Sequence, residues 1–195
     1  MTASVGWLVF PGMDMLDFAG PCEVFVMASR IAQRDGEATP FQIHTIAESL
    51  EPVTVQGGLT ILPHHTIADH PDLDCLILPG GLAGLTPLID RGDVVDWVTR
   101  QAATVPLVAS VCTGAFLLAQ TGLLAGLKAT THIARTDDLR HRFPEVDVVE
   151  NHRWVDSGRF VTSAGASAGI DLALHLVERL ANRDLSVGCA RALDL

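Results

Sequence analysis

The residue of this sequence most suited to a chemical reaction is Cys112. It follows the apolar, β-favouring stretch 106–111, and a helix-forming run begins at Gly114. This order predicts a sharp turn from a strand into a helix, with the thiol at the positive end of the helix dipole. Oriented N–H groups stabilise a thiolate, so we expect the turn to lower the pKa of the Cys112 thiol. The pattern is that of a nucleophile elbow with cysteine in place of serine, and the alternative is a buried structural cysteine.

Two other segments hold residues that can act together with this thiol. Gly80-Gly81 follows an apolar run, and glycines let backbone N–H groups approach a ligand closely. The N–H groups of Gly81 and Thr113 are therefore candidate oxyanion donors, unless the glycine pair forms only an ordinary turn. Asp17 comes shortly after another apolar run. It is a candidate proton shuttle for the thiol, and the alternative is a helix N-cap.

Two later polar residues complete the set of candidates. His132 ends a short strand-like run and is a candidate general base, although a lone histidine there commonly has a structural role. Asp171 falls in the first turns of an apolar helix, where the dipole favours a carboxylate. Its apolar neighbours Ile170 and Leu172 predict burial, so we expect Asp171 to have a polar partner in the core. The histidines lack metal-ligand spacing, and we expect no metal site.

Composition and charge narrow the class of protein. The 195 residues are 48% hydrophobic with a mean hydropathy of +0.32, which predicts a globular chain. The net charge of −10 argues against nucleic-acid binding through this domain, because phosphate contacts need clustered basic residues. The four cysteines are far apart, as in a protein of the reducing cytoplasm. The apolar runs are too short for a membrane span, and no signal peptide is apparent, so we expect a cytoplasmic protein without membrane contact.

The candidate residues are positioned by strands that alternate with helices. Apolar strands in this pattern predict a mostly parallel sheet between two helical layers, a three-layer α/β/α sandwich. Ligands of such sheets bind at the carboxyl ends of the strands, where Cys112, Gly80 and Asp17 fall.

We find no repeat or linker and expect one domain over residues 1–195. The expected strands are Ser4–Phe10, Phe41–Ala47, Val53–Val55, Leu59–Leu62, Asp74–Leu78, Leu107–Val111, Ala129–Thr131, Asp147–Val149, Trp154–Val155 and Phe160–Thr162, and the expected helices are Leu16–Arg30 (interrupted near its start by Gly20-Pro21), Val94–Ala103, Ala134–Phe143 and Ala166–Ala181.

Five motifs in this order resemble the ThiJ/PfpI superfamily, within the class I glutamine amidotransferase-like fold. The resemblance covers nearly the whole chain and implies a flavodoxin-like sheet with a cysteine nucleophile elbow. It also implies a homodimer. The motifs are Phe10-Pro11-Gly12 with Leu16-Asp17-Phe-Ala-Gly20-Pro21, Leu78-Pro79-Gly80-Gly81, Ser110-Val111-Cys112-Thr113-Gly114, Ala129-Thr-Thr-His132 and Ser167-Ala-Gly169-Ile-Asp171.

Two of these motifs, Leu-Asp-x-x-Gly-Pro and Ser-Val-Cys-Thr-Gly, look like those of the isocyanide hydratase branch of the superfamily. By position, the resemblance implies Cys112 as nucleophile, Asp17 as essential acid and Thr113 as a contact beside the nucleophile. Asp171 matches an aspartate near the site, and His132 a histidine found widely in the superfamily. The implied reaction adds water to R–N≡C and gives an N-substituted formamide through a Cys112 thioimidate. It implies a small electrophilic substrate and no cofactor.

The sequence leaves two alternatives to a hydratase. The same motifs resemble the N-terminal domains of AraC-type regulators, which implies a ligand- or redox-sensing domain without turnover. Hydrolase or amidotransferase-like chemistry would need a Cys-His-Glu triad, and Glu150 follows His132 only at a distance. Other branches place a glutamate near the thiol where this chain has Asp17, which disfavours a glyoxalase- or deglycase-like activity.

Overall fold

The fold is built on a twisted, mostly parallel sheet. The computed structural model describes residues 2–195, and within them seven strands form the sheet in the order β10-β11-β7-β6-β1-β2-β5. Every neighbouring pair is parallel except β10 and β11, which form the predicted hairpin. The strands are β1 (Ala3–Leu8), β2 (Phe41–Ala47), β5 (His65–Thr66), β6 (Cys75–Leu78), β7 (Leu107–Ser110), β10 (Trp154–Ser157) and β11 (Phe160–Ser163).

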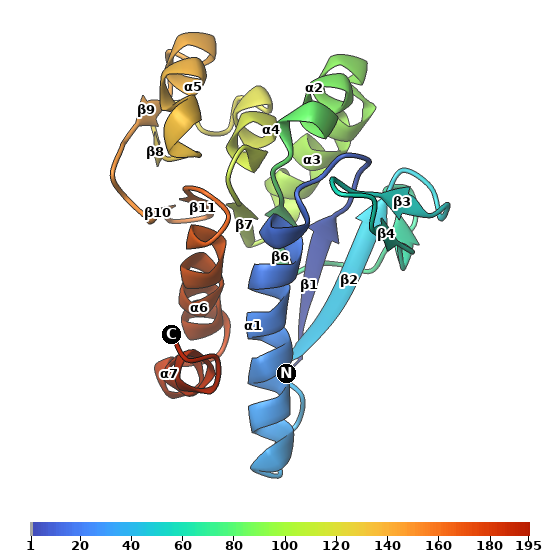
Figure 1. Cartoon of the computed structure of the whole chain (residues 1–195), viewed down its shortest axis with the longest axis vertical. Helices are drawn as coiled ribbons and strands as arrows, with labels where there is room; N and C mark the ends of the chain where they lie inside the picture. Colours follow the sequence, from blue (N-terminus) through green and yellow to red (C-terminus); the bar gives the residue numbers. More distant parts are fainter. Residues whose placement is uncertain (1) are drawn as a thin grey trace.

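Helices cover both faces of the sheet, which confirms the three-layer sandwich (Figure 1). One layer holds α1 (Met15–Arg34), α6 (Ala168–Leu180) and α7 (Arg183–Ala192), and these three helices pack against one another. The other layer holds α2 (Leu82–Arg91), α3 (Asp93–Thr104) and α4 (Gly114–Gln120). A 3₁₀ turn (Ile133–Arg135) leads into α5 (Thr136–Arg142) beside this second layer.

The alternation of side chains along each strand divides the core between the two layers. In β6, Cys75 and Ile77 pack under α1 and α6, whereas Leu76 and Leu78 pack under α3 and α4. All four side chains are buried, as expected for a central strand with helices on both faces. The neighbouring strands follow the same rule, and Trp7 of β1 lies fully buried on the α1 side.

Several elements differ from the sequence predictions. Helix α1 runs unbroken through Gly20-Pro21, because the proline ring sits only two turns into a helix that packing on α6 and α7 supports. Helices α2 and α7 and strand β5 were not predicted. The first two contain helix-weakening residues (Pro87 and Gly188), and β5 is only two residues long.

The short predicted strands lie outside the main sheet. β3 (Val53–Thr54) and β4 (Thr60–Ile61) form the expected small hairpin. β8 (Lys128–Ala129) pairs in parallel with β9 (Asp147–Val148) in a second two-stranded sheet. The segment that leads to His132 therefore lies beside the central sheet and is not one of its strands.

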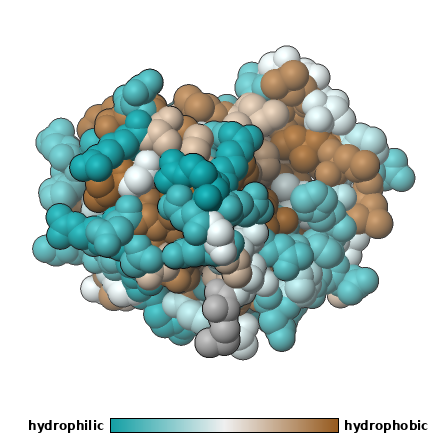
Figure 2. All heavy atoms as spheres, turned by 90° about the horizontal axis from the view of Figure 1, so that it is seen from below, coloured by the Kyte–Doolittle hydropathy of each residue, from teal (hydrophilic) through white to brown (hydrophobic). Residues whose placement is uncertain are grey.

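The two ends of the parallel strands differ in character. The loops after β1, β6 and β7 carry the candidate residues at the carboxyl end of the sheet. Figure 2 views the molecule from the opposite end, where hydrophilic side chains cover much of the surface. Among residues 2–195, no helix is long and apolar enough to cross a membrane.

Candidate active site

Cys112 occupies a strained turn between β7 and α4, as predicted for a nucleophile elbow. Its φ angle is +54°, a left-handed conformation that residues with a side chain rarely adopt. Two hydrogen bonds hold the turn: the Cys112 N–H donates to the Ala164 carbonyl at 2.9 Å, and the Thr131 hydroxyl donates to the Cys112 carbonyl at 2.8 Å. The surrounding segments therefore fix the nucleophile in this conformation.

Two glycines allow the chain to pack this closely around the thiol. A Cβ atom at Gly114 would collide with the Leu78 carbonyl oxygen. A Cβ atom at Gly80 would collide with the Asp17 carboxylate and would lie 2.8 Å from both the backbone nitrogen and the hydroxyl of Thr113. The glycine pair predicts a loop open to a ligand, and the structure shows that Gly80 instead leaves room for the Asp17 carboxylate.

Asp17 lies in the first turn of α1 and is fully buried beside Cys112. Its Oδ2 accepts a hydrogen bond from the Gly80 N–H at 3.0 Å, and a carboxylate oxygen of Asp17 lies within 4.8 Å of the Cys112 sulfur. Among residues 2–195, no group is hydrogen-bonded to the other oxygen, Oδ1. A buried carboxylate with a free oxygen next to a thiol is suited to proton transfer.

The surroundings of Asp17 favour its protonated form more than water does. Burial raises the pKa of Asp17 to about 6, and the nearby Asp14 carboxylate adds to the rise. The hydrogen bond from the Gly80 N–H and the nearby Cys112 thiol act in the opposite direction. Asp17 can therefore give or take a proton close to neutral pH.

The pKa of the Cys112 thiol moves in the direction opposite to our expectation. Burial and the Asp17 carboxylate raise this pKa to about 12, and Asp14 contributes further. The N–H of Thr113 lowers it, but burial and the two neighbouring carboxylates outweigh this effect. The predicted lowering is wrong, and Cys112 rests as a thiol.

Thr113 connects the elbow to the glycine loop. Its hydroxyl oxygen accepts a hydrogen bond from the Gly81 N–H at 3.0 Å, and its own N–H lowers the pKa of the Cys112 thiol. The Gly81 N–H, a candidate oxyanion donor, is thus already paired in this structure. A reacting group could reach it only by displacing the Thr113 hydroxyl.

His132 and Asp171 lie in positions that give them other partners. The Nδ1 atom of His132 accepts the Ala134 N–H at 3.2 Å and caps the 3₁₀ turn, so this nitrogen is not available as a base. Asp171 is half-exposed and forms an ion pair with Arg153. The expectation that Asp171 is a buried polar group is wrong, because it lies on a side of α6 that faces solvent.

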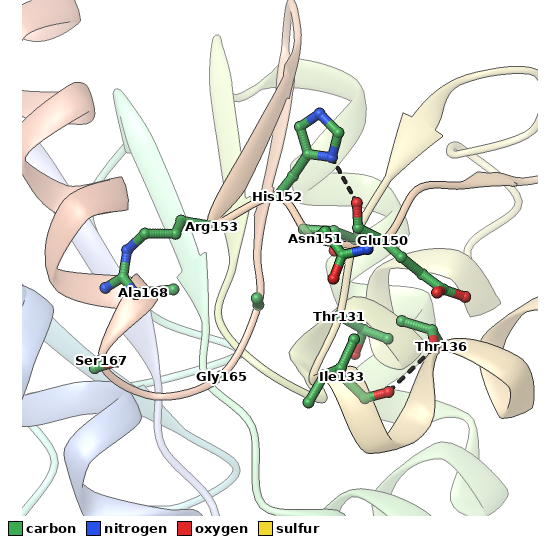
Figure 3. A pocket seen from close by; sticks show the side chains of 12 residues that line it. Thr131, Ile133, Thr136, Glu150, Asn151, His152, Arg153, Gly165, Ser167 and Ala168 are labelled. Carbon is green, nitrogen blue, oxygen red and sulfur yellow. Dashed lines mark hydrogen bonds between the residues drawn. The ribbon is translucent and has the colours of Figure 1, made fainter.

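A cavity of about 320 Å³ lies behind the elbow (Figure 3). Thr131 and Ala164, the two residues bonded to the Cys112 backbone, form part of its wall, but Cys112 itself does not line it. Figure 3 shows Arg153 and Ser167 on one side of the cavity and Ile133 and Thr136 on the other. Neither Thr131 nor Ala164 was a candidate site residue in the sequence, because each acts on Cys112 from another segment of the chain.

Known proteins similar to this chain identify its family. Residues 3–179 match the model of the DJ-1/PfpI family. The chain belongs to the DJ-1/PfpI family. An isonitrile hydratase of Pseudomonas putida is 37% identical over 185 residues, which are 94% of this chain and 75% of that protein.

Other DJ-1/PfpI proteins similar to this chain include transcriptional regulators. The regulator GbdR of Pseudomonas aeruginosa is 30% identical over 183 residues, and this chain spans about half of its length (48%). The crystal structure of a ThiJ/PfpI family protein from Pseudomonas syringae superposes with a TM-score of 0.87 at 29% identity, over 100% of this chain and 75% of that one. The family thus joins proteins named as enzymes and as regulators.

Proposed function

We propose that this protein is an isocyanide hydratase, which adds water to R–N≡C and releases an N-substituted formamide. The observation that carries the proposal is the Cys112 thiol at a strained elbow with the buried Asp17 carboxylate within 4.8 Å of its sulfur. Such a pair can supply both a nucleophile and a proton without a cofactor. The 37% identity to an isonitrile hydratase over most of the chain supports the same reaction.

The first step forms the covalent intermediate. The Cys112 proton moves to Asp17 as the sulfur attacks the terminal carbon of the isocyanide. Asp17 then delivers that proton to the same carbon, which gives the thioimidate R–N=CH–S–Cys112. The N–H of Thr113, which lowers the pKa of the thiol, stabilises the thiolate character that develops during the attack.

The second step hydrolyses the thioimidate. The Asp17 carboxylate takes a proton from water as the hydroxide oxygen bonds to the carbon, and it passes this proton to the nitrogen. Collapse of the tetrahedral intermediate forms the formamide carbonyl and breaks the C–S bond. The hydroxyl proton returns to the sulfur through Asp17, so the thiol is regenerated and only water is consumed.

The experiment is incubation of the reduced protein with a small aromatic isocyanide, with the formamide followed by its absorbance. We expect turnover by the wild-type protein and its loss in Cys112→Ala and Asp17→Asn. Cys75→Ala is the matched control, because Cys75 is a buried thiol on the neighbouring strand β6. Absence of formamide with folded, reduced wild-type protein would refute the proposal.

The regulators among the relatives favour a second candidate, a domain that senses a small molecule without turnover. The raised pKa of Cys112 leaves little thiolate, which disfavours the sensing of oxidants. Mass spectrometry after mild peroxide treatment tests that form: oxidation of Cys112 no faster than that of Cys22, Cys75 and Cys189 excludes a redox sensor. A reversible ligand that binds without chemical change would support a ligand sensor.

We also propose that the active protein is a homodimer in the cytoplasm, as the resemblance implies. Light scattering during gel filtration measures the oligomeric state directly. A mass near 20.8 kDa, the mass of one chain, would contradict the dimer.

A further inference from the structure

A second carboxylate lies against the catalytic pair. Asp14, Asp17 and Cys112 each offer an atom, a carboxylate oxygen or the sulfur, and these atoms all lie within 4.8 Å of one another. Asp14 is only partly buried, whereas Asp17 is fully buried. Two carboxylates at this distance repel each other when both are ionised.

The backbone holds Asp14 in this place. Its N–H donates to the Gly80 carbonyl at 3.0 Å, and its carbonyl accepts the Asp17 N–H at 3.1 Å. Asp14 is the N-cap residue of α1, yet its side chain makes no cap hydrogen bond. A capping bond commonly stabilises a helix by about 1 kcal/mol, so a carboxylate here that does not cap points to another role.

Three neighbouring groups change the pKa of Asp17, and they come from three parts of the chain. Asp14 lies on the same helix, the Gly80 N–H follows β6, and the Cys112 thiol follows β7. Helices α6 and α7 also pack against α1, but within residues 2–195 none of their charged side chains acts on Asp17. Asp171 of α6 is paired with Arg153. Asp14 is therefore the sole ionisable neighbour of the pair in this part of the chain.

We propose that Asp14 is a positioning residue, whose negative charge strengthens the hold of the Asp17–Cys112 pair on its proton. This inference rests on the proposed function. The reaction moves that proton from sulfur to Asp17 and then to the substrate carbon, so the pair must not lose it to solvent. Asp14 touches neither the substrate nor the reacting atoms in this scheme, and it acts through electrostatic repulsion alone.

The test removes the charge of Asp14 and keeps a side chain of the same shape. Asparagine is as good an N-cap as aspartate, so Asp14→Asn preserves the start of α1. We expect Cys112 in this variant to react with iodoacetamide about three- to tenfold faster than in the wild type at the same pH between 6 and 9. A thiol pKa lower by about half a unit to one unit gives this factor. Peptide mass spectrometry separates Cys112 from the other cysteines.

Two variants control for charge and shape. Asp14→Glu keeps the charge and is expected to react at the wild-type rate. Glu23→Gln removes an exposed charge from the same helix, and its rate is also expected to match the wild type. Equal rates for Asp14→Asn and the wild type would overturn the inference, as would a Glu23→Gln or Asp14→Glu rate as high as that of Asp14→Asn.

The turnover assay separates this inference from the proposed function. In Asp14→Asn, we expect the acid limb of the isocyanide hydration profile, where Asp17 titrates, to move to lower pH by about half a unit to one unit, because the Asp14 carboxylate raises the pKa of Asp17. An unmoved limb contradicts the inference. If the wild-type protein hydrates no isocyanide, the proposed function fails, and the labelling rates of Cys112 still decide the role of Asp14.

Discussion

Replacement of Asp17 by asparagine should change the free energy of unfolding in a way that depends on pH. The difference between the variant and the wild type should become more favourable to the variant as the pH rises. Asp17 is fully buried, and its pKa rises from 3.8 to about 6 on folding. A group whose pKa is raised in the folded state favours folding most when it is protonated. Its contribution is fully present below pH 3.8 and is lost as the pH rises through about 6. The wild-type protein therefore carries a stability cost above that pH.

The size of this cost follows from the shift. A rise of about 2 pH units (from 3.8 to about 6) corresponds to about 3 kcal/mol over the full titration. Between pH 4 and pH 8, about 2 kcal/mol of this difference should be observable. Asparagine keeps an oxygen that can accept the Gly80 N–H, so its own effect should not depend on pH.

The assay is urea unfolding of the wild type and Asp17→Asn at several pH values from 4 to 8. We expect the difference in unfolding free energy, variant minus wild type, to increase by about 2 kcal/mol across this range. The matched control is Asp171→Asn, which removes a half-exposed carboxylate in an ion pair. A difference that stays constant or decreases with pH would refute the explanation of the Asp17 pKa by burial.

Three further predictions concern the residues around the pair. Gly80→Ala should destabilise the fold by about 2 kcal/mol or more and abolish activity, because the added Cβ would collide with Asp17 and Thr113. The control Gly188→Ala has room on α7 and should be neutral or slightly stabilising in the same urea titration. Thr113→Val should cost about 1–3 kcal/mol in unfolding free energy, because it leaves the buried Gly81 N–H unpaired, and Thr113→Ser should restore most of it. Asp171→Asn should change stability at pH 7 by less than about 1 kcal/mol and leave the rate of isocyanide hydration unchanged, since the Arg153 pair is exposed.

The sequence predicted the scaffold of the site better than its electrostatics. The apolar stretch before Cys112, the glycine after it and the helix-forming run were enough to predict the elbow, because each is a local signal. Thr131 and Ala164 could not be found in this way, since they hold Cys112 through backbone contacts from distant segments. Burial decides the pKa of the thiol, and the sequence shows the helix dipole but not the two carboxylates packed against the sulfur.

The remaining differences also come from tertiary packing. The apolar neighbours of Asp171 suggested burial, but the face of α6 on which it lies is set by how the helix packs on α1. The sequence predicts His132 as a candidate base, yet its Nδ1 atom caps a 3₁₀ turn. Gly80 was assigned to a loop that receives a ligand, and the structure fills that place with Asp17.

The most direct test of the proposed mechanism is the intact mass of the protein quenched during turnover of an aromatic isocyanide. The thioimidate retains every atom of the substrate, so the account predicts an adduct heavier than the protein by the full mass of one isocyanide. Peptide mapping should place it on Cys112, and it should be absent from Cys112→Ala. Formamide production by Cys112→Ala at the wild-type rate, or an adduct on Cys22, Cys75 or Cys189, would contradict the account.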